Sequence, residues 1–217
     1  MNIAIIGTEK LCEELIIVIS QGNNTRIFEI DKIPSNESFD ILIDLDFDKD
    51  THKHWQYLNK VNASVFLLGA TFIQLSSIHF DTKRNQVFGI CALPTLLPRT
   101  TLEYSSAAGI NLPENVVHSL NFKEALRVDD RVGMVTPRVV CMIINEAYYT
   151  VQEGTASRSD VDLGMKLGTA YPLGPFEWAK KIGEYNVYAL LKAVYEDTMD
   201  ERYKICNLLK TEALKVS

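Results

Sequence analysis

The chain of 217 residues lacks any apolar run that approaches the length of a membrane-spanning helix. Residues 1–6 lead into an apolar stretch without the basic region that typically opens a secretory signal. From these two absences we predict a cytoplasmic location and no membrane partner.

Positive charge is also in short supply, because 22 lysines and arginines are outnumbered by 28 aspartates and glutamates, for a net charge of −6. The sequence contains no basic run, no repeat and no low-complexity segment. A negative protein repels nucleic acid, so we expect no nucleic-acid partner.

Cysteine is scarce and scattered. The four cysteines are widely spaced, and they are Cys12, Cys91, Cys141 and Cys206. This distribution fits reduced thiols better than disulfides or a zinc site.

Short apolar runs alternate with helical patterns through the first 130 residues. The predicted strands are residues 2–6, 25–30, 41–45, 64–68, 86–93, 101–104 and 125–128, and the predicted helices are 9–20, 52–61 and 113–120. This alternation predicts an α/β fold with a Rossmann-like doubly wound parallel sheet.

From residue 131 onward the pattern is helical. Residues 135–151 are apolar nearly all round, which predicts a buried central helix. Signals for helix ends follow at Gly154, Ser157-x-x-Asp160, Gly174-Pro175 and Gly183. We therefore predict two domains, residues 1–130 and an all-α C-terminal domain of residues 131–217.

Short pieces between residues 133 and 183 carry a family resemblance through their order and spacing. They are Ile144-Asn145-Glu146-Ala147, Glu153-Gly154, Asp160-x-Asp162, Met165-Lys166-Leu167-Gly168 and Tyr171-Pro172-x-Gly174-Pro175-x-Glu177. Together they resemble the C-terminal helical domain of the 3-hydroxyacyl-CoA dehydrogenases. The resemblance implies a homodimer through residues 133–217 and an acyl-CoA ligand. It also implies an NAD-binding domain in residues 1–130, shortened because only residues 31–40 stand where the family carries a long helical insertion.

The loop that should bind the cofactor is degenerate. The Rossmann pattern Gly-x-Gly-x-x-Gly reads Gly7-Thr8-Glu9-Lys10-Leu11-Cys12 here, so only Gly7 remains. Glu9 places a Cβ and a negative charge where backbone should meet pyrophosphate. Glu29, 22 residues after Gly7, occupies the position of an acidic residue that binds ribose hydroxyls. We expect no cofactor, and NAD is implied by the resemblance only.

The catalytic positions of the family are also altered. The resemblance implies a histidine as general base, a glutamate twelve residues later that orients it, and a serine and an asparagine that hold the substrate. Cys91 stands at the histidine position, and Glu103 retains the glutamate and its spacing. Ile73 and Pro137 stand at the serine and asparagine positions.

His79, Cys91 and Glu103 also admit other interpretations. His79 precedes the strand that should carry the base, so we interpret it as a surface histidine. Cys91 is a poor nucleophile beside Glu103, because a nearby negative charge disfavours thiolate. Glu103 could serve instead as an ion-pair partner of Arg99 or Arg138.

No metal site is predicted. His52 and His54 are two residues apart and do not share a helix face. The alternating aspartates, Asp44, Asp46, Asp48 and Asp50, lack the glycine and glutamate of a calcium loop. They are typical of a solvated strand end.

These features favour a divergent 3-hydroxyacyl-CoA dehydrogenase homologue with lost or strongly reduced NAD-dependent activity. Its role would be that of an acyl-CoA-binding or dimeric partner protein. The alternative is an active NAD-dependent oxidoreductase on 3-hydroxyacyl-CoA, of the fatty acid β-oxidation type, with a rearranged site.

Overall fold

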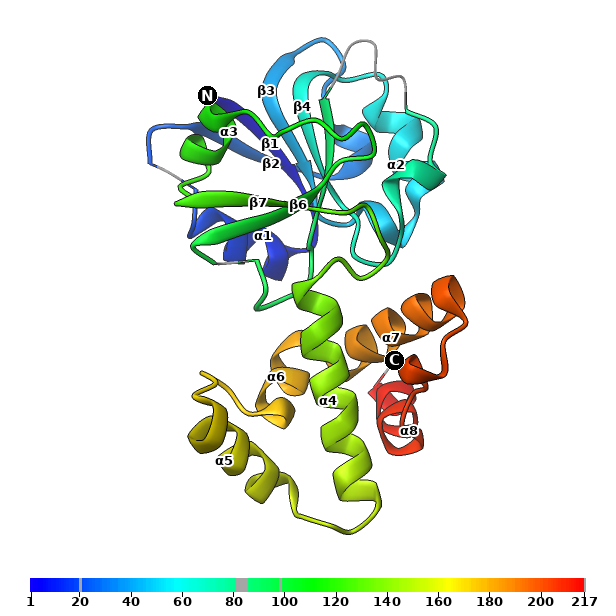
Figure 1. The fold of residues 1–217 in the computed structure, drawn as a ribbon. Coiled ribbons are helices and arrows are strands. Elements are labelled where there is room, and N and C mark those ends of the chain that lie inside the picture. The colour runs from blue at the N-terminus through cyan, green and yellow to red at the C-terminus, as the bar shows by residue number, and fades with distance from the viewer. Residues whose placement is uncertain (20, 81–85, 98, 217) are drawn as a thin grey trace. The chain divides into compact units, whose positions relative to one another are not determined.

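A computed structural model describes residues 1–19, 21–80, 86–97 and 99–216 of the chain. The chain forms two compact units (Figure 1). One contains Met1–Ala92 and Leu96–Met134, and the other joins Leu93–Thr95 to the chain from Val135 onward.

The first unit is built on a seven-stranded sheet in the order β2-β1-β3-β4-β5-β6-β7. The strands are β1 (Asn2–Ile6), β2 (Asn24–Phe28), β3 (Ser38–Asp44), β4 (Asn62–Gly69), β5 (Gln86–Ile90), β6 (Thr101–Ser105) and β7 (Glu124–Val128). Neighbouring strands are parallel except for the β5–β6 pair. The predicted α/β, Rossmann-like class is confirmed.

The β5–β6 pair is antiparallel, with Gly89 opposite Ser105 and Ile90 opposite Tyr104. The connection between them is residues 91–100, whose described part contains no helix. A parallel pair needs a crossover of a dozen or more residues, whereas an antiparallel pair can be joined by a short loop. The sheet is therefore parallel-dominated, with one reversed pair that the alternation of strands and helices did not predict.

Helices cover both faces of this sheet (Figure 1). Leu15 of α1 (Glu9–Ile16) and Val116 of α3 (Glu114–Ser119) share one apolar cluster with the strands, and Leu58 of α2 (Thr51–Leu58) belongs to the cluster on the other face. Helix α1 ends earlier than predicted, and residue 20 of the predicted helix 9–20 lies outside the described residues. Three short 3-10 helices follow strands: η1 (Ile30–Lys32), η2 (Phe47–Lys49) and η3 (Leu75–Ser77).

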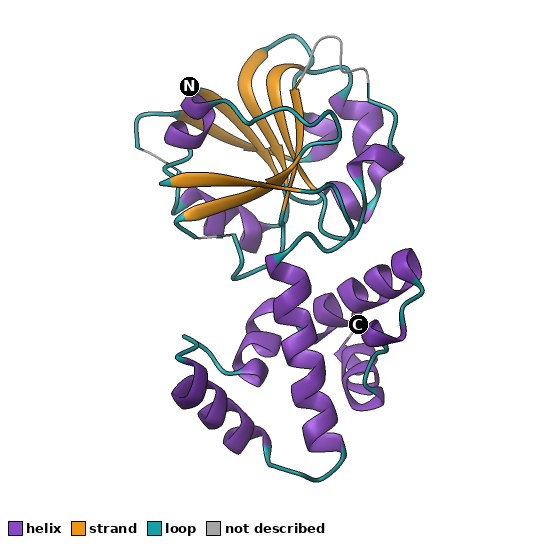
Figure 2. Ribbon diagram, in the orientation of Figure 1, coloured by secondary structure: helices purple, strands orange, loops and turns teal. Residues whose placement is uncertain are grey.

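The second unit is helical throughout its regular structure (Figure 2). Its elements are α4 (Thr136–Gln152), α5 (Arg158–Thr169), α6 (Pro175–Ile182), α7 (Glu184–Thr198), η4 (Glu201–Tyr203) and α8 (Asn207–Val216). Helix α4 contacts all four of the other α-helices, so it forms the centre of the unit.

Helix α4 is nevertheless not buried on every side. Cys141, Ile144 and Tyr148 are almost fully buried, whereas Val139 is 52% exposed. Helix α4 is therefore the predicted buried central helix on the side that meets the other helices, and its remaining apolar side chains are exposed within the single chain.

Some of the residues that carry the family resemblance make hydrogen bonds within this unit. The Asn145 side-chain amide donates to the carbonyl oxygen of Lys204 at 2.9 Å and accepts from the backbone N–H of Cys206 at 2.9 Å. These bonds tie α4 to the segment that precedes α8.

Asp162 and Glu177, which also belong to the motif, connect α5 to α6 through a hydrogen bond and an ion pair. The Asp162 carboxylate accepts a 2.8 Å hydrogen bond from the Phe176 backbone N–H. Glu177 accepts from the backbone N–H of Gly174 at 2.9 Å and pairs with Lys166 at 2.6 Å. These motif residues therefore contribute to the packing of the helical unit.

Candidate functional site

A crevice of about 850 Å³ lies where β1, β2 and β3 end at their carboxyl ends. In an open, mostly parallel sheet this is the edge at which ligands bind. Both residues predicted from the sequence to contact a cofactor, Gly7 and Glu29, line it. The crevice is therefore the candidate ligand site. The chemistry of the residues that line it determines which ligands it can bind.

Cys12 fills the space beneath the loop that follows β1. A Cβ on Gly7 would lie 3.0 Å from Cβ of Leu45 and 3.3 Å from Sγ of Cys12, so a side chain here would be tightly packed. Burial, together with the nearby charges of Asp46 and Asp44, raises the pKa of the Cys12 thiol to about 11. Cys12 is therefore a neutral thiol that occupies the place of a phosphate-loop glycine.

Glu9 opposes an anion at the start of α1. It is exposed in the first helical turn, and the N-cap residue Thr8 makes no side-chain capping bond. The N-terminal end of a helix dipole is positive and attracts negative charge. In α1 the carboxylate of Glu9 already provides this negative charge. A pyrophosphate at this point would be repelled by Glu9.

The lining of the crevice is acidic overall. Its carboxylates outnumber its amines, the former being Glu9, Glu13, Glu29, Asp31 and Asp46, the latter Lys32 and Lys53. Lys32 pairs with Glu29 at 2.7 Å between exposed side chains. Such a lining does not fit the two negative charges of a dinucleotide pyrophosphate, so no step through NAD is assigned to it.

A buried dyad also borders the crevice. Asp44, at the end of β3, is 0% exposed, and its Oδ2 lies 2.6 Å from Nδ1 of His54 on α2. The Asp46 backbone N–H donates to the other carboxylate oxygen at 3.1 Å. Burial raises the pKa of Asp44, and the hydrogen bond from His54 opposes that rise.

The prediction that the alternating aspartates form a solvated strand end is therefore wrong for Asp44. The sequence offered one signal for the Asp44–His54 pair. Asp44 lies at the carboxyl end of a buried strand, ten residues before His54 in a helix. It was missed because the pairing depends on how α2 packs beside β3.

The other aspartates of this segment have structural partners as well. Asp48 accepts hydrogen bonds from the backbone N–H groups of Thr71 and Phe72 at 2.8 and 3.2 Å. Burial raises the pKa of this half-buried carboxyl to about 7. Asp50 caps α2 by accepting from the Lys53 backbone N–H at 3.0 Å. Among the described residues no cluster of three or more histidine, cysteine, aspartate or glutamate side chains could hold a metal ion.

The predicted catalytic residues lie next to the reversed pair of strands. Cys91 directly follows β5 and is buried, and Glu103 is half-buried on β6. The register between the two strands ends at Ile90 and Tyr104, which are the chain neighbours of Cys91 and Glu103.

The residues at the other two catalytic positions are packing residues. Ile73 packs against the apolar cluster that contains Phe66 and Leu68, and Pro137 is buried in the first turn of α4. Neither offers a hydroxyl or an amide to a substrate. His79 is exposed and outside regular structure, as predicted for a surface histidine.

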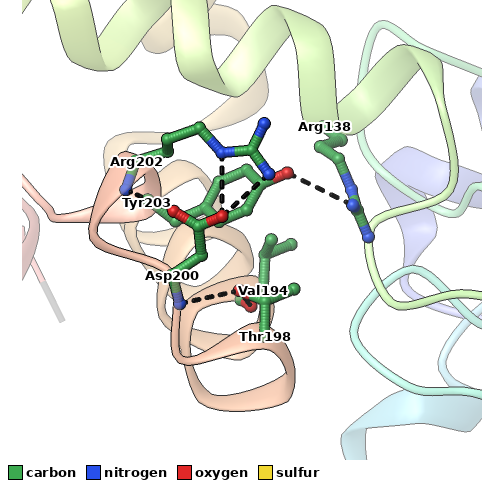
Figure 3. A network of polar contacts seen from close by, with 6 residues as sticks. All are labelled: Arg138, Val194, Thr198, Asp200, Arg202 and Tyr203. Atoms are coloured by element: carbon green, nitrogen blue, oxygen red, sulfur yellow. Dashed lines mark hydrogen bonds and ion pairs between the residues drawn. The ribbon is translucent and has the colours of Figure 1, made fainter.

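Arg138 of α4 takes part in a polar network with η4 (Figure 3). Its Nη1 donates to the Tyr203 hydroxyl at 3.3 Å, and its guanidinium lies 5.6 Å from the centre of that ring. Asp200 holds Arg202 through a bond of 2.9 Å to Nε. Arg138, Arg202 and Tyr203 border a hollow of about 360 Å³. Its remaining lining is Val139, Met142 and Ile143.

The sequence comparison with a protein-family model finds a match in the C-terminal part of the chain. Residues 133–215 match the model of the 3-hydroxyacyl-CoA dehydrogenase C-terminal domain. The 3-hydroxyadipyl-CoA dehydrogenase of Escherichia coli is 41% identical over 92 residues, which are 42% of this chain and 19% of that protein. The chain thus covers about a fifth of that relative's length.

Solved structures extend the likeness to the first unit. FadB2 of M. tuberculosis superposes with a TM-score of 0.79 at 15% identity, covering 99% of this chain and 93% of its own. A 3-hydroxybutyryl-CoA dehydrogenase from Escherichia coli gives a TM-score of 0.58 at 30% identity, covering 70% of this chain and 32% of its own. Within the described part of the chain, no helix is both long and apolar enough to span a membrane.

Proposed function

Residues 133–215 belong to the 3-hydroxyacyl-CoA dehydrogenase family, and from this premise we propose that the chain is a homologue without NAD-dependent hydride transfer. Its role in this proposal is that of a homodimeric protein that binds an acyl-CoA or partners an active enzyme. The observation that carries the proposal is the acidic crevice in which Glu9 and Cys12 replace the glycines of the phosphate loop.

A second feature supports the loss of hydride transfer, and it concerns the removal of the hydroxyl proton. Oxidation of a 3-hydroxy group needs a base to remove the hydroxyl proton as hydride leaves. Cys91 offers no imidazole at that position, and Ile73 and Pro137 offer no polar group to hold the substrate. Removing either contribution typically costs a few powers of ten in rate.

A dimer is supported by the surface of α5. No residue of this helix is buried within the chain, and Leu163 and Leu167 are 54% and 78% exposed. Apolar side chains grouped on one helix are typical of an interface. The hollow beside Arg138 and Arg202, with apolar walls and two guanidinium groups, suits an acyl chain with an anionic head.

The second candidate function is an active NAD-dependent oxidoreductase on 3-hydroxyacyl-CoA. It is favoured by the positions of Cys91 and Glu103 next to the end of the β5–β6 register and by the crevice at the carboxyl ends of β1, β2 and β3. In this case the base would come from a rearranged site.

An NADH fluorescence titration, followed by an assay for acetoacetyl-CoA reduction, separates the two. The proposal expects no saturation below about 1 mM NADH, corresponding to a binding free energy weaker than about −4 kcal/mol. Saturation at micromolar NADH together with turnover would establish the enzyme instead. Titration with acyl-CoA esters tests whether the protein binds an acyl-CoA.

A further inference from the structure

We propose that the hollow between α7, η4 and α8 binds a nucleotide that carries a terminal phosphate. It is called the lysine hollow here, after Lys192, Lys204 and Lys210 in its lining. Its volume is about 470 Å³, and it lies within the helical unit, where α7 packs against both η4 and α8 (Figure 1). The site is separate from the acidic crevice and from the hollow beside Arg138, and it does not depend on the proposed function.

The lining of the lysine hollow is positive in a protein whose net charge is −6. Its charged side chains are three lysines and one carboxylate, Glu201, which leaves a net charge of +2. Within the part of the chain that the structure describes, Lys204 and Lys210 form no ion pair. Lys192 lies 3.7 Å from Glu196, and such a pair between exposed side chains contributes little. Ammonium groups donate hydrogen bonds and carry positive charge, so this lining selects an anion such as phosphate.

Two aromatic rings stand beside the lysines. Tyr188 and Tyr195 lie seven residues apart on α7 with Lys192 between them, so the three side chains share one face of the helix. The Tyr195 hydroxyl donates to Glu201 at 2.9 Å, which fixes the ring and engages the carboxylate of the lining. Aromatic side chains stack on nucleobases, because every base has a π-face. The hollow therefore offers a surface for a base next to cations for a phosphate.

The segment that joins η4 to α8 forms a wall of the hollow that is held by α4. The carbonyl oxygen of Lys204 accepts from the Asn145 side chain at 2.9 Å, and the Cys206 backbone N–H donates to the same side chain at 2.9 Å. The Leu208 backbone N–H donates to the Gln152 side chain at 2.9 Å. These bonds fix the wall before a ligand arrives, and a pre-formed wall lowers the entropic cost of binding.

The combination of lysines and tyrosines narrows the class of ligand. An inorganic anion would leave the rings without a partner, and an uncharged nucleoside would leave the ammonium groups without one. A nucleotide with a terminal phosphate matches both. ADP and CoA each carry such a phosphate, so either is a source of the shared chemistry.

Isothermal titration calorimetry of the full chain with ADP at low ionic strength, without magnesium, tests the site. Adenosine and inorganic pyrophosphate are the comparison probes, because each carries one half of the chemistry. We expect one saturable ADP site per chain and at least about tenfold weaker binding of each half, since binding free energies of 1.4 kcal/mol correspond to tenfold. A titration with CoA in place of ADP tells which source of the nucleotide binds more tightly. Absence of saturation with both ADP and CoA, or pyrophosphate that binds as tightly as ADP, would overturn the proposal.

Lys204→Gln/Lys210→Gln should weaken ADP binding at least about tenfold, because each ammonium group donates a charge-assisted hydrogen bond. The matched control is Lys180→Gln/Lys215→Gln, which removes two exposed lysines of the same unit that do not line the hollow. The control should leave ADP affinity unchanged. An equal loss in both double variants would show non-specific attraction and end the proposal.

Tyr188→Leu tests the aromatic surface. It should weaken ADP binding at least about fivefold, because stacking of a base on an aromatic ring contributes on that order, and should leave the affinity for pyrophosphate unchanged. Unchanged ADP affinity in this variant would contradict the stacking role of the ring.

NADH titrations of the unmodified protein and of Lys204→Gln/Lys210→Gln separate this site from the proposed function. Micromolar NADH binding that the double variant retains would refute the loss of NAD binding and leave the ADP result standing. Micromolar NADH binding that the double variant loses would place NADH in the lysine hollow and support the site. A chain that binds neither NADH nor ADP nor CoA refutes the nucleotide site alone.

Discussion

Asp44 at the end of β3 and His54 on α2 form a buried hydrogen bond of 2.6 Å between Oδ2 and Nδ1. Because Asp44 is 0% exposed, its carboxylate depends on this bond and on the backbone N–H of Asp46 at 3.1 Å. The bond therefore fastens α2 to the sheet edge and directs the imidazole toward the crevice.

Replacement of His54 by alanine should destabilise the fold by about 3 kcal/mol, because it leaves a buried carboxylate without its partner. Urea unfolding measures the change. The control is His52→Ala, which removes an exposed side chain bonded to Gln56 on the same helix and should change stability by less than about 0.5 kcal/mol. Equal effects of the two substitutions would show that the buried bond contributes little.

Asp48 should make the stability of the first unit fall as pH rises from about 4 to about 7. Its pKa is raised from the ordinary value of 3.8 to about 7 by burial, and Asp44 and Asp46 add like charge nearby. Between these values the native state keeps the proton that the unfolded chain releases. The stabilisation is complete at the acidic end of this window and is lost as pH passes the folded-state pKa.

Asp48→Asn removes this titration while retaining an oxygen that can accept from Thr71 and Phe72. The melting temperature of the variant should decline less between pH 5 and pH 7.5 than that of the unmodified protein, a window that brackets about 7. Parallel melting curves across this range would rule out Asp48 as the source.

Gly174→Ala should destabilise the helical unit by about 2 kcal/mol, because the added Cβ meets a well-packed neighbour. That neighbour is Asp162, whose own Cβ would lie 2.5 Å away. Gly164→Ala on α5 is the matched control, since nothing lies within 4 Å of its added Cβ. In the control, alanine should stabilise by up to about 1 kcal/mol through helix propensity. Thermal unfolding that ranks the variants in the opposite order would contradict this account of the motif.

Cys91→His alone should not produce reduction of acetoacetyl-CoA above background. It restores a base at position 91, twelve residues before Glu103, but leaves Glu9 and Cys12 in the loop after β1. A spectrophotometric assay of NADH consumption checks this. Activity in the unmodified protein that disappears on Glu103→Gln would contradict the proposal and indicate a rearranged site.

Multi-angle light scattering at tens of micromolar protein should give twice the chain mass of 24.5 kDa, without added nucleotide. Leu163→Glu/Leu167→Glu should shift the mass toward the monomer, because both side chains are exposed on α5. Circular dichroism controls for folding of the variant. A monomer mass for the unmodified protein would refute the homodimer.

The amino-acid sequence by itself determined the features that are written in short-range pattern. The apolar runs of β1, β3 and β4 and the helical periodicity of α1 and α2 are local, so the α/β class followed from them. The degenerate loop from Gly7 to Cys12 was equally visible, because a phosphate loop is a contiguous motif. The spacing of Asn145, Asp162 and Glu177 identified them as part of the family resemblance. The hydrogen bonds that they make could not be read from the sequence.

Only the tertiary structure decided which distant residues meet. The reversal of β6 against β5 depends on strand pairing that no local pattern encodes. The burial of Asp44 against His54 depends on how α2 packs beside β3. A charged side chain near a strand end has the same local signature whether it meets water or a buried partner, and only packing distinguishes the two.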